Sequence, residues 1–195
     1  MDLSVLNNEQ RAAVECLDGP LLVLAGAGSG KTRVLTYRIA NLIEHGVKPW
    51  NVLALTFTNK AAAEMRERAA ALVGEGAEEM WVTTFHSCCA KMLRIDCDRL
   101  GYERNFTIYA DSDQMKVIGD ILKDMGMNEK NMPKREMKER ISNAKNKSLN
   151  PEQFLADTYA DGEGLTLRVY KQYEKRLRAA NALDFDDLLV KTLAL

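Results

Sequence analysis

The sequence predicts an α/β fold, in which a parallel sheet with helices on both faces is interrupted by a mostly α-helical module. Two observations support this prediction. Apolar runs at 21–25, 52–56 and 81–84 each lead into a helical pattern, and successive strand-helix units form parallel sheets with right-handed connections. From about residue 99 to 182 this alternation gives way to consecutive helical patterns. With 195 residues, 46% of them hydrophobic, the chain suits one or two domains with real cores.

Composition and charge narrow the class of protein. The formal net charge is −1, so no global field attracts the chain to nucleic acid or to a membrane, and nucleic-acid contacts must come from local basic faces. No apolar run is long enough to cross a bilayer and no signal peptide is evident, which predicts a cytoplasmic protein without membrane contact. The four cysteines form no CxxC pair, which favours reduced thiols. A metal cluster of His86, Cys88, Cys89 and Cys97 is the weaker alternative, because the adjacent cysteines point to different faces of a helix.

The strongest local signal is a phosphate-binding loop. The run 21–25 predicts a central strand buried on both faces, and three glycines alternate with small residues over 26–30. Such a loop directs backbone N–H groups at an anion, and the following helix adds the positive end of its dipole. In this interpretation Lys31 reaches the β- and γ-phosphates of a nucleotide, and the Thr32 hydroxyl ligates Mg²⁺. The N–H groups that would face the phosphates belong to Ala27, Gly28, Ser29, Gly30, Lys31 and Thr32.

The loop departs at one position from the strict phosphate-binding pattern, and it also has an alternative interpretation. The strict pattern begins with glycine, where this chain has Ala25, and an ordinary glycine-rich turn between a strand and a helix is the alternative interpretation.

Upstream of the loop, Asn7 is predicted to cap a short helix. Gln10 lies one turn into that helix, where a glutamine is typically solvated, and only a neighbouring nucleotide would change this interpretation. Downstream, further helices are predicted at 31–45 and 61–73.

Polar and aromatic residues follow two of the predicted strands, at 56–60 and 84–87. Open α/β sheets bind their ligands at the carboxyl ends of strands. An aromatic ring beside hydroxyls, an amide and a lysine suits an unstacked base with its phosphate. The residues alone favour the other interpretation, in which Phe57 and Phe85 belong to the core and His86 is a satisfied helix cap.

The module that follows is mostly helical and locally basic. Six basic residues face two acidic ones across 134–147, and five face one across 168–178. Charge runs on helices are most often solvated faces, and a surface that contacts phosphates is the alternative. The helices are predicted at 112–125, capped by Asp111, and at 133–147, 151–160 and 164–180.

Paired aspartates near the end of the sequence suggest a Mg²⁺ site, but a helix cap explains them better. Asp184, Asp186 and Asp187 are interpreted as a cap and as first-turn charges, because no apolar strand precedes them. Nowhere does the sequence place four apolar strand residues before Asp-Glu, the acidic pair that a P-loop ATPase needs for Mg²⁺ and water.

Together these motifs closely resemble the N-terminal part of UvrD/Rep/PcrA-type superfamily 1 DNA helicases. The resemblance covers nearly the whole chain. Its five ordered motifs are Leu6-Asn7-x-x-Gln10, the loop from Ala25 through Arg33, Leu55 to Met65, Trp81 to Ser87, and Leu183 to Leu189.

The resemblance implies a RecA-like motor lobe that uses ATP and Mg²⁺. Residues 1–92 and 183–195 would form this lobe, and residues 93–182 would form a helical insertion usually called 1B. Gln10 would hydrogen-bond adenine and Arg33 would stack on it, while Lys31 and Thr32 would hold the phosphates and Mg²⁺. The residues that would contact single-stranded DNA are Phe57, Asn59, Thr84, His86 and Phe185.

The implied activity is ATP-driven movement 3′ to 5′ along one DNA strand, with contacts to a junction of single- and double-stranded DNA. The sequence departs from the family's full enzymes by stopping before the Asp-Glu-x-x-Asp motif and the second motor lobe, so we expect a fragment of a longer protein. The alternative, for the chain as it stands, is a catalytically inert module that binds nucleotide and single-stranded nucleic acid. An unpaired apolar strand and an apolar C-terminal helix would favour self-association.

Overall fold

The computed structural model describes residues 1–127, 133–157 and 164–195. The chain divides into two compact units, Met1–Cys88 and Cys89–Leu195, which are described separately. The end of the helix predicted at 151–160 lies outside the described residues. No helix within the described ranges is long and apolar enough to cross a membrane.

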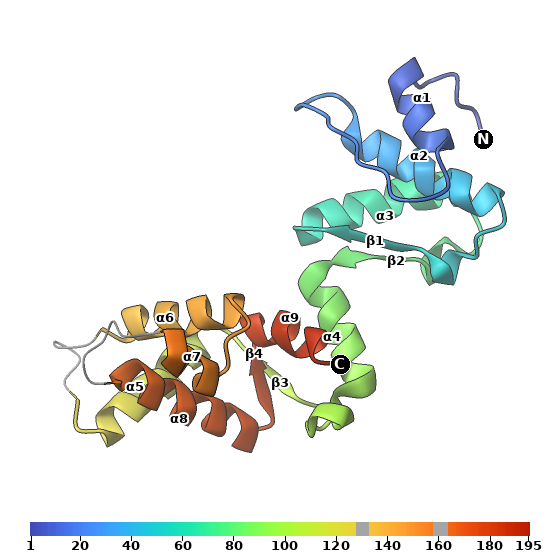
Figure 1. Ribbon diagram of the computed structural model, residues 1–195. Helices are drawn as coiled ribbons and strands as arrows, with labels where there is room; N and C mark the ends of the chain where they lie inside the picture. Colours follow the sequence, from blue (N-terminus) through green and yellow to red (C-terminus); the bar gives the residue numbers. More distant parts are fainter. Residues whose placement is uncertain (128–132, 158–163) are drawn as a thin grey trace. The chain divides into compact units, whose positions relative to one another are not determined.

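The first unit is a small α/β unit built on two parallel strands (Figure 1). Strand β1 (Leu53–Thr56) pairs in parallel with β2 (Trp81–Thr84), from Leu53 opposite Trp81 to Thr56 opposite Thr84. The helices of this unit are α1 (Asn8–Glu15), α2 (Lys31–Glu44), α3 (Asn59–Val73) and the start of α4 (Phe85–Asp96), with 3-10 turns at Pro49–Asn51 and Ala77–Glu79.

The core of this unit joins α2 and α3 to one face of the sheet. Ala54 and Val82 are the buried apolar residues of the two strands, and Ile39, Met65 and Ala69 pack against them from the two helices. The sequence pattern places these apolar residues at helical spacing, which is why both helices begin and end close to the predicted positions. The parallel pairing of the two strands is confirmed.

The prediction of a buried central strand at 21–25 is wrong for this structure. Residues 21–26 have no strand assignment, and Leu22 and Leu24 are 82% and 87% exposed. An apolar run becomes a strand only where neighbouring strands satisfy its backbone groups, and within the described residues β1 and β2 pair with each other instead. The sequence pattern carries no information on which partner a strand finds.

The second unit is mostly helical, as predicted (Figure 1). Ile118, Met137 and Tyr173 are among the fully buried residues that its largest core takes from three of the helices. Its helices are α5 (Asp111–Asp124), α6 (Lys134–Asn146), α7 (Pro151–Asp157), α8 (Leu165–Ala179) and α9 (Phe185–Leu193), with a 3-10 turn at Cys97–Leu100. Ala110, not the predicted Asp111, is the N-cap of α5, and its N–H donates to the Asp113 carboxylate at 3.0 Å.

Sequence reasoning missed a pair of short parallel strands in this unit. Strand β3 (Thr107–Tyr109) pairs with β4 (Ala182–Asp184). Three residues are too few to display a strand periodicity, so no pattern marked them. Asn181, at φ 46°, reinforces the pairing because its side-chain amide accepts from Glu103 N at 2.9 Å and donates to Asn105 Oδ1 at 3.0 Å.

Candidate functional site

The glycine-rich loop before α2 has the conformation that its glycines permit. Gly28 and Gly30 take φ angles of 76° and 81°, in the left-handed region that side chains rarely adopt. Gly30 is the N-cap of α2, and its carbonyl accepts the helix's hydrogen bond from Val34 at 3.0 Å. The Ser29 hydroxyl donates to Gly26 O at 2.7 Å. The loop is therefore a tight turn that leads directly into the helix N-terminus.

Lys31 lies at the first position of α2 and folds back over this loop. Its ammonium donates to Ala25 O at 3.1 Å and to Gly26 O at 2.7 Å. Thr32 follows it on the helix with a half-buried side chain. The charge of Lys31 thus faces the loop's own carbonyl oxygens, where a phosphate oxygen would compete for the same donor.

Gln10 connects the N-terminal helix to the loop. Asn7 and Gln10 form a capping box at the start of α1, and Gln10 Nε2 also donates to Ser29 O at 2.9 Å. A Cβ at Gly30 would lie 2.8 Å from that nitrogen, so the close approach requires a glycine. Gln10 is therefore a packed partner of the loop and not simply a solvated helix residue.

These residues line a pocket of about 420 Å³ in the first unit. Arg68 of α3 completes the pocket wall, and sequence reasoning missed it. Its guanidinium lies 3.8 Å from the Glu64 carboxylate, which is the signature of an ordinary surface pair on a helix and gives no local signal of a site. The lining residues are Gln10, Gly28, Ser29, Gly30, Lys31, Thr32, Arg33 and Arg68.

An exposed aromatic pair lies at the carboxyl ends of β1 and β2. Phe57 is 91% exposed, so the interpretation of this residue as part of the core is wrong. Its ring centroid is 5.7 Å from that of Phe85, which is also exposed, at an interplanar angle of 37°. Asn59, the first residue of α3, is exposed nearby in the sequence. Sheet pairing brings the two rings together because parallel strands end at the same edge.

Thr84 and His86 are less accessible than the two rings. Thr84 is buried, its hydroxyl donates to Ser87 Oγ at 2.9 Å, and it accepts from Ser87 N at 3.3 Å. The Thr84 side chain therefore holds the first turn of α4. His86 is half-buried in the same turn.

The helix cap predicted for the C-terminal aspartates is confirmed in the second unit. Asp187 N donates to Asp184 Oδ1 at 2.8 Å, and Asp184 N donates to Asp187 Oδ2 at 3.2 Å. The reason given from the sequence was wrong, because the short strand β4 does precede the helix. Phe185 occupies the first position of α9, directly after the cap, and is half-exposed.

A buried lysine holds this cap, and sequence reasoning placed that lysine on a solvated basic face. Lys145 of α6 is 2% exposed. Its ammonium lies 2.8 Å from Asp184 Oδ2, 2.9 Å from Asp187 Oδ1 and 2.7 Å from Glu174 Oε1. The Tyr173 hydroxyl also donates to Asp184 at 3.0 Å. No pattern in the sequence distinguishes Lys145 from its exposed neighbours except its place on the apolar face of α6.

Burial and charge set the titration of this cluster. Burial alone would lower the pKa of Lys145, but Asp187, Asp184 and Glu174 together hold it well above its ordinary value. Burial raises the pKa of Asp187 to about 7; the charges of Asp184 and Glu174 act in the same direction, and Lys145 opposes them. The described residues include no group of three or more His, Cys, Asp or Glu side chains arranged to hold a metal ion.

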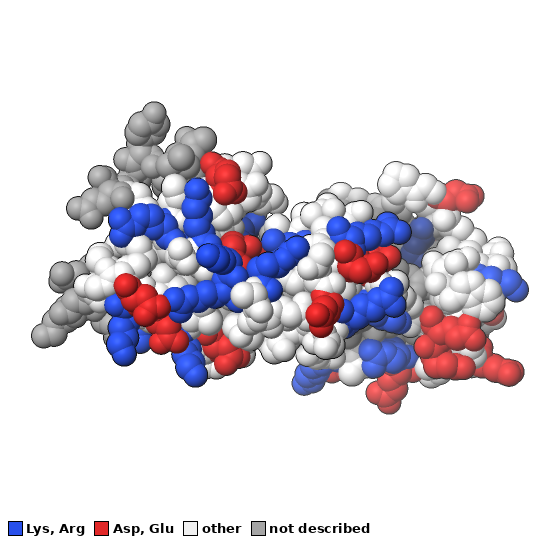
Figure 2. Space-filling view, turned by 90° about the horizontal axis from the view of Figure 1, so that it is seen from below, with Lys and Arg blue, Asp and Glu red and all other residues white. Residues whose placement is uncertain are grey.

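The basic surface of the second unit is visible in Figure 2, where Lys and Arg side chains gather over one face with acidic side chains between them. Several of the basic residues of α6 are paired. Arg140 Nη2 lies 2.8 Å from Glu136 Oε1, and Arg135 Nε lies 3.5 Å from Glu139 Oε1. Lys138 forms an ion pair with Asp111. The basic run is therefore partly neutralised where it is exposed.

The comparisons with known proteins agree with this combination of a phosphate-loop turn, parallel strands and a helical unit. Residues 6–195 match the family described as UvrD/REP helicase N-terminal domain, and the chain belongs to that family. It is 50% identical over 196 residues to the ATP-dependent DNA helicase PcrA of Bacillus subtilis, and 49% identical over 194 residues to that of Staphylococcus aureus. Each alignment covers 99% of this chain but only 26% and 27% of the relative, respectively.

Proposed function

We propose that the chain carries the ATP-binding lobe and part of the DNA-binding surface of an ATP-dependent helicase that moves 3′ to 5′ along single-stranded DNA in the cytoplasm. The observation that carries the proposal is the pocket in which Gln10, the loop and Lys31 converge. Membership of the helicase family supports the nucleotide as its ligand. We also propose the domain assignment that the family resemblance implies, in which residues 1–92 and 183–195 belong to a RecA-like lobe and residues 93–182 to a helical insertion.

The residues of the pocket fit Mg·ATP. The left-handed glycines leave the backbone open to close approach. Among the described residues, the Lys31 ammonium contacts two carbonyl oxygens, and a phosphate can replace them. Lys31 binds the β- and γ-phosphates, the Thr32 hydroxyl holds Mg²⁺, and the N–H groups of 27–32 surround the anion. Bound Mg²⁺ neutralises phosphate charge during phosphoryl transfer. Gln10 contacts adenine and Arg33 stacks on it, and we add Arg68 as a further cation at the pocket wall.

Single-stranded DNA binds across the strand ends, with Phe57 as the stacking surface. Its ring is exposed and supported by Phe85 at 5.7 Å, a geometry that suits stacking on a base. Asn59 lies beside it at the exposed start of α3. Thr84 and His86 shape the turn that follows β2. Within the second unit, the half-exposed ring of Phe185 is a separate proposed DNA contact. The DNA partner includes the junction of single and double strands.

A second reading concerns the 195 residues as a polypeptide on their own. They contain no apolar strand followed by Asp-Glu, so they lack the acid that orients water and holds Mg²⁺. We therefore propose that this polypeptide binds nucleotide and single-stranded DNA without turnover.

ATP hydrolysis in the presence of single-stranded DNA tests this proposal. Phosphate release by the 195-residue polypeptide should stay at the level of the protein-free blank, while a fluorescent ATP analogue still binds. Lys31→Ala serves as the matched control for the loop. A DNA-stimulated rate that Lys31→Ala abolishes would show that these residues form a complete ATPase and would overturn the inert reading.

A further inference from the structure

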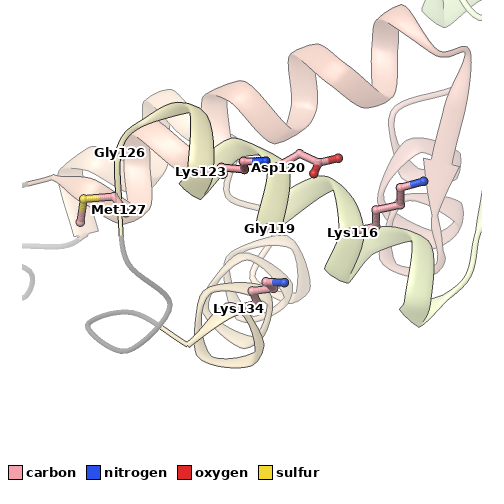
Figure 3. Close-up of a pocket in the computed structure, with 7 residues that line it drawn as sticks. All are labelled: Lys116, Gly119, Asp120, Lys123, Gly126, Met127 and Lys134. Atoms are coloured by element: carbon pink, nitrogen blue, oxygen red, sulfur yellow. The ribbon is translucent and has the colours of Figure 1, made fainter.

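A second pocket, of about 530 Å³, lies in the helical unit between α5 and the start of α6 (Figure 3). None of its residues belongs to the nucleotide pocket or to the strand-end aromatic pair. The lining residues are Lys116, Gly119, Asp120, Lys123, Gly126, Met127 and Lys134.

Three lysines and one aspartate give this pocket a positive charge. Lys116 and Lys123 are seven residues apart on α5 and so lie on one face of the helix, and Lys134 is the first residue of α6. Across the described parts of the chain, Lys116 and Lys123 form no ion pair. The three lysines line one hollow, so their like charges repel one another, and a bound anion reduces that repulsion.

Gly119 is the feature that makes this arrangement specific. It lies in the middle of α5, where glycine destabilises a helix relative to alanine, and its φ is not in the left-handed region. A Cβ at this position would lie 2.7 Å from Lys134 Cε and 2.9 Å from Lys134 Nζ. The missing side chain therefore lets Lys134 lie along α5, between the turns that carry Lys116 and Lys123.

We propose that this pocket binds phosphate groups. Three ammonium groups around one concave surface suit adjacent phosphates, for which lysine acts as a point charge. The phosphates come either from a nucleic-acid backbone or from a free oligophosphate. With a nucleic-acid ligand the inference rests on the proposed helicase function, and with a free oligophosphate it stands independently of that function.

The test uses the 195-residue chain carrying Lys31→Ala, so that the loop of the first unit does not contribute to phosphate binding. Two ligands are titrated in parallel: tripolyphosphate by calorimetry, and a duplex oligonucleotide at several salt concentrations. Adding Lys116→Ala and Lys123→Ala should weaken binding of the true ligand at least about tenfold. For the duplex, the slope of log K against log salt should also fall by about 0.9 for each lost contact. Lys48→Ala combined with Lys175→Ala, two exposed lysines outside the pocket, removes the same number of charges and is the control, which should change neither.

Two single substitutions separate binding from folding. Gly119→Ala should raise the urea midpoint, because alanine favours the helix, and should weaken phosphate binding, because Lys134 must move. That loss should disappear when Lys134 is already alanine. Asp120→Asn should strengthen binding, because it removes the only carboxylate among the described lining residues.

The outcomes distinguish the ligands. Weakened binding of duplex alone identifies a nucleic-acid backbone, and weakened binding of tripolyphosphate alone identifies a free oligophosphate. If the folded variants bind both ligands as the Lys31→Ala parent does, the proposal is wrong. Because the parent already lacks Lys31, none of these results depends on whether the first pocket binds ATP.

Discussion

Phe57 projects from the end of β1 with 91% of its surface exposed, which is unusual for a phenylalanine in a folded unit. Phe85 contacts it from the end of β2, and together they form an apolar surface at the edge where a parallel sheet presents its ligands. An exposed ring contributes little to the core. Its removal therefore separates a binding role from a structural one.

We predict that Phe57→Ala weakens single-stranded DNA binding by about 1–3 kcal/mol, the contribution of one stacked base. Fluorescence anisotropy with a labelled oligonucleotide measures the effect. The urea midpoint should stay unchanged, and Trp50→Ala, another exposed aromatic in the same unit, should leave affinity unchanged. Equal affinity of the Phe57 variant and the wild type would show that no base stacks on this ring.

The site residues differ in how far sequence alone could identify them. The loop from Ala27 to Thr32 could be identified from the sequence, because closely spaced glycines directly before a helix are typical of a phosphate-binding site. Gln10 could not be separated from a solvated residue, because its bond to Ser29 joins distant parts of the chain. Arg68 could not be found at all, since only the packing of α3 beside the loop brings it to the pocket.

At the level of elements, α9 depends on a buried ionic cluster. Its N-terminal cap, Asp184 with Asp187, is held by Lys145 from α6 and shares that lysine with Glu174 from α8. Three elements thus meet on one ammonium group. Removing one member of such a cluster leaves the others buried without compensation, which is strongly destabilising. The exposed ring of Phe185 follows this cap directly, so the cluster also positions that ring.

The raised pKa of Asp187, about 7, predicts that the free energy of unfolding depends on pH. The carboxyl group of Asp187 keeps its proton up to about pH 7 in the folded state but loses it near the ordinary pKa of 3.8 in the unfolded chain. Between these two pH values the folded state therefore binds more protons than the unfolded chain. Asp187 therefore contributes stability at low pH that is lost as pH rises toward 7, at a rate of up to about 1.4 kcal/mol per pH unit.

Urea unfolding of the wild type and Asp187→Asn between pH 4.5 and 8 measures this contribution. The stability of the wild type relative to the variant should fall as pH rises and should level off above about pH 7. A difference that is constant across this range, or that grows with pH, would mean that Asp187 stays ionised in the folded state.

Most helices were predicted to within a few residues, because their apolar stripes are long enough to show a period. The strands were predicted less well. β1 and β2 were found, β3 and β4 were too short to detect, and the apolar run at 21–25 did not become a strand. Strand formation depends on a partner elsewhere in the chain, which local patterns do not reveal.

At the scale of the whole molecule, the exposed apolar side chains among the described residues include two groups outside the proposed DNA surface. The segment 21–24 exposes all four of its side chains, and Leu193 of α9 is 81% exposed. The expected cause of self-association was an unpaired strand edge, but the segment forms no strand, so the exposed apolar surface is the remaining cause.

We predict that the 195-residue chain self-associates through this surface at micromolar to millimolar concentrations. Light scattering coupled to size exclusion should show a mass that rises with concentration, and Leu22→Ser with Leu24→Ser should lower it. Thr83→Ser, a small change on the sheet, is the control. A constant monomer mass for the wild type across the whole range would contradict the prediction.

The central claim is that the loop and Gln10 form a site for Mg·ATP, and calorimetric titration of Mg·ATP tests it most directly. The wild type should bind. Lys31→Ala should lose at least about tenfold in affinity through the lost phosphate contact, and Gln10→Ala should reduce the preference for ATP over GTP. Lys48→Ala, a lysine of the same unit outside the pocket, should bind as the wild type does. Equal affinity of the wild type and a folded Lys31→Ala variant would contradict the account.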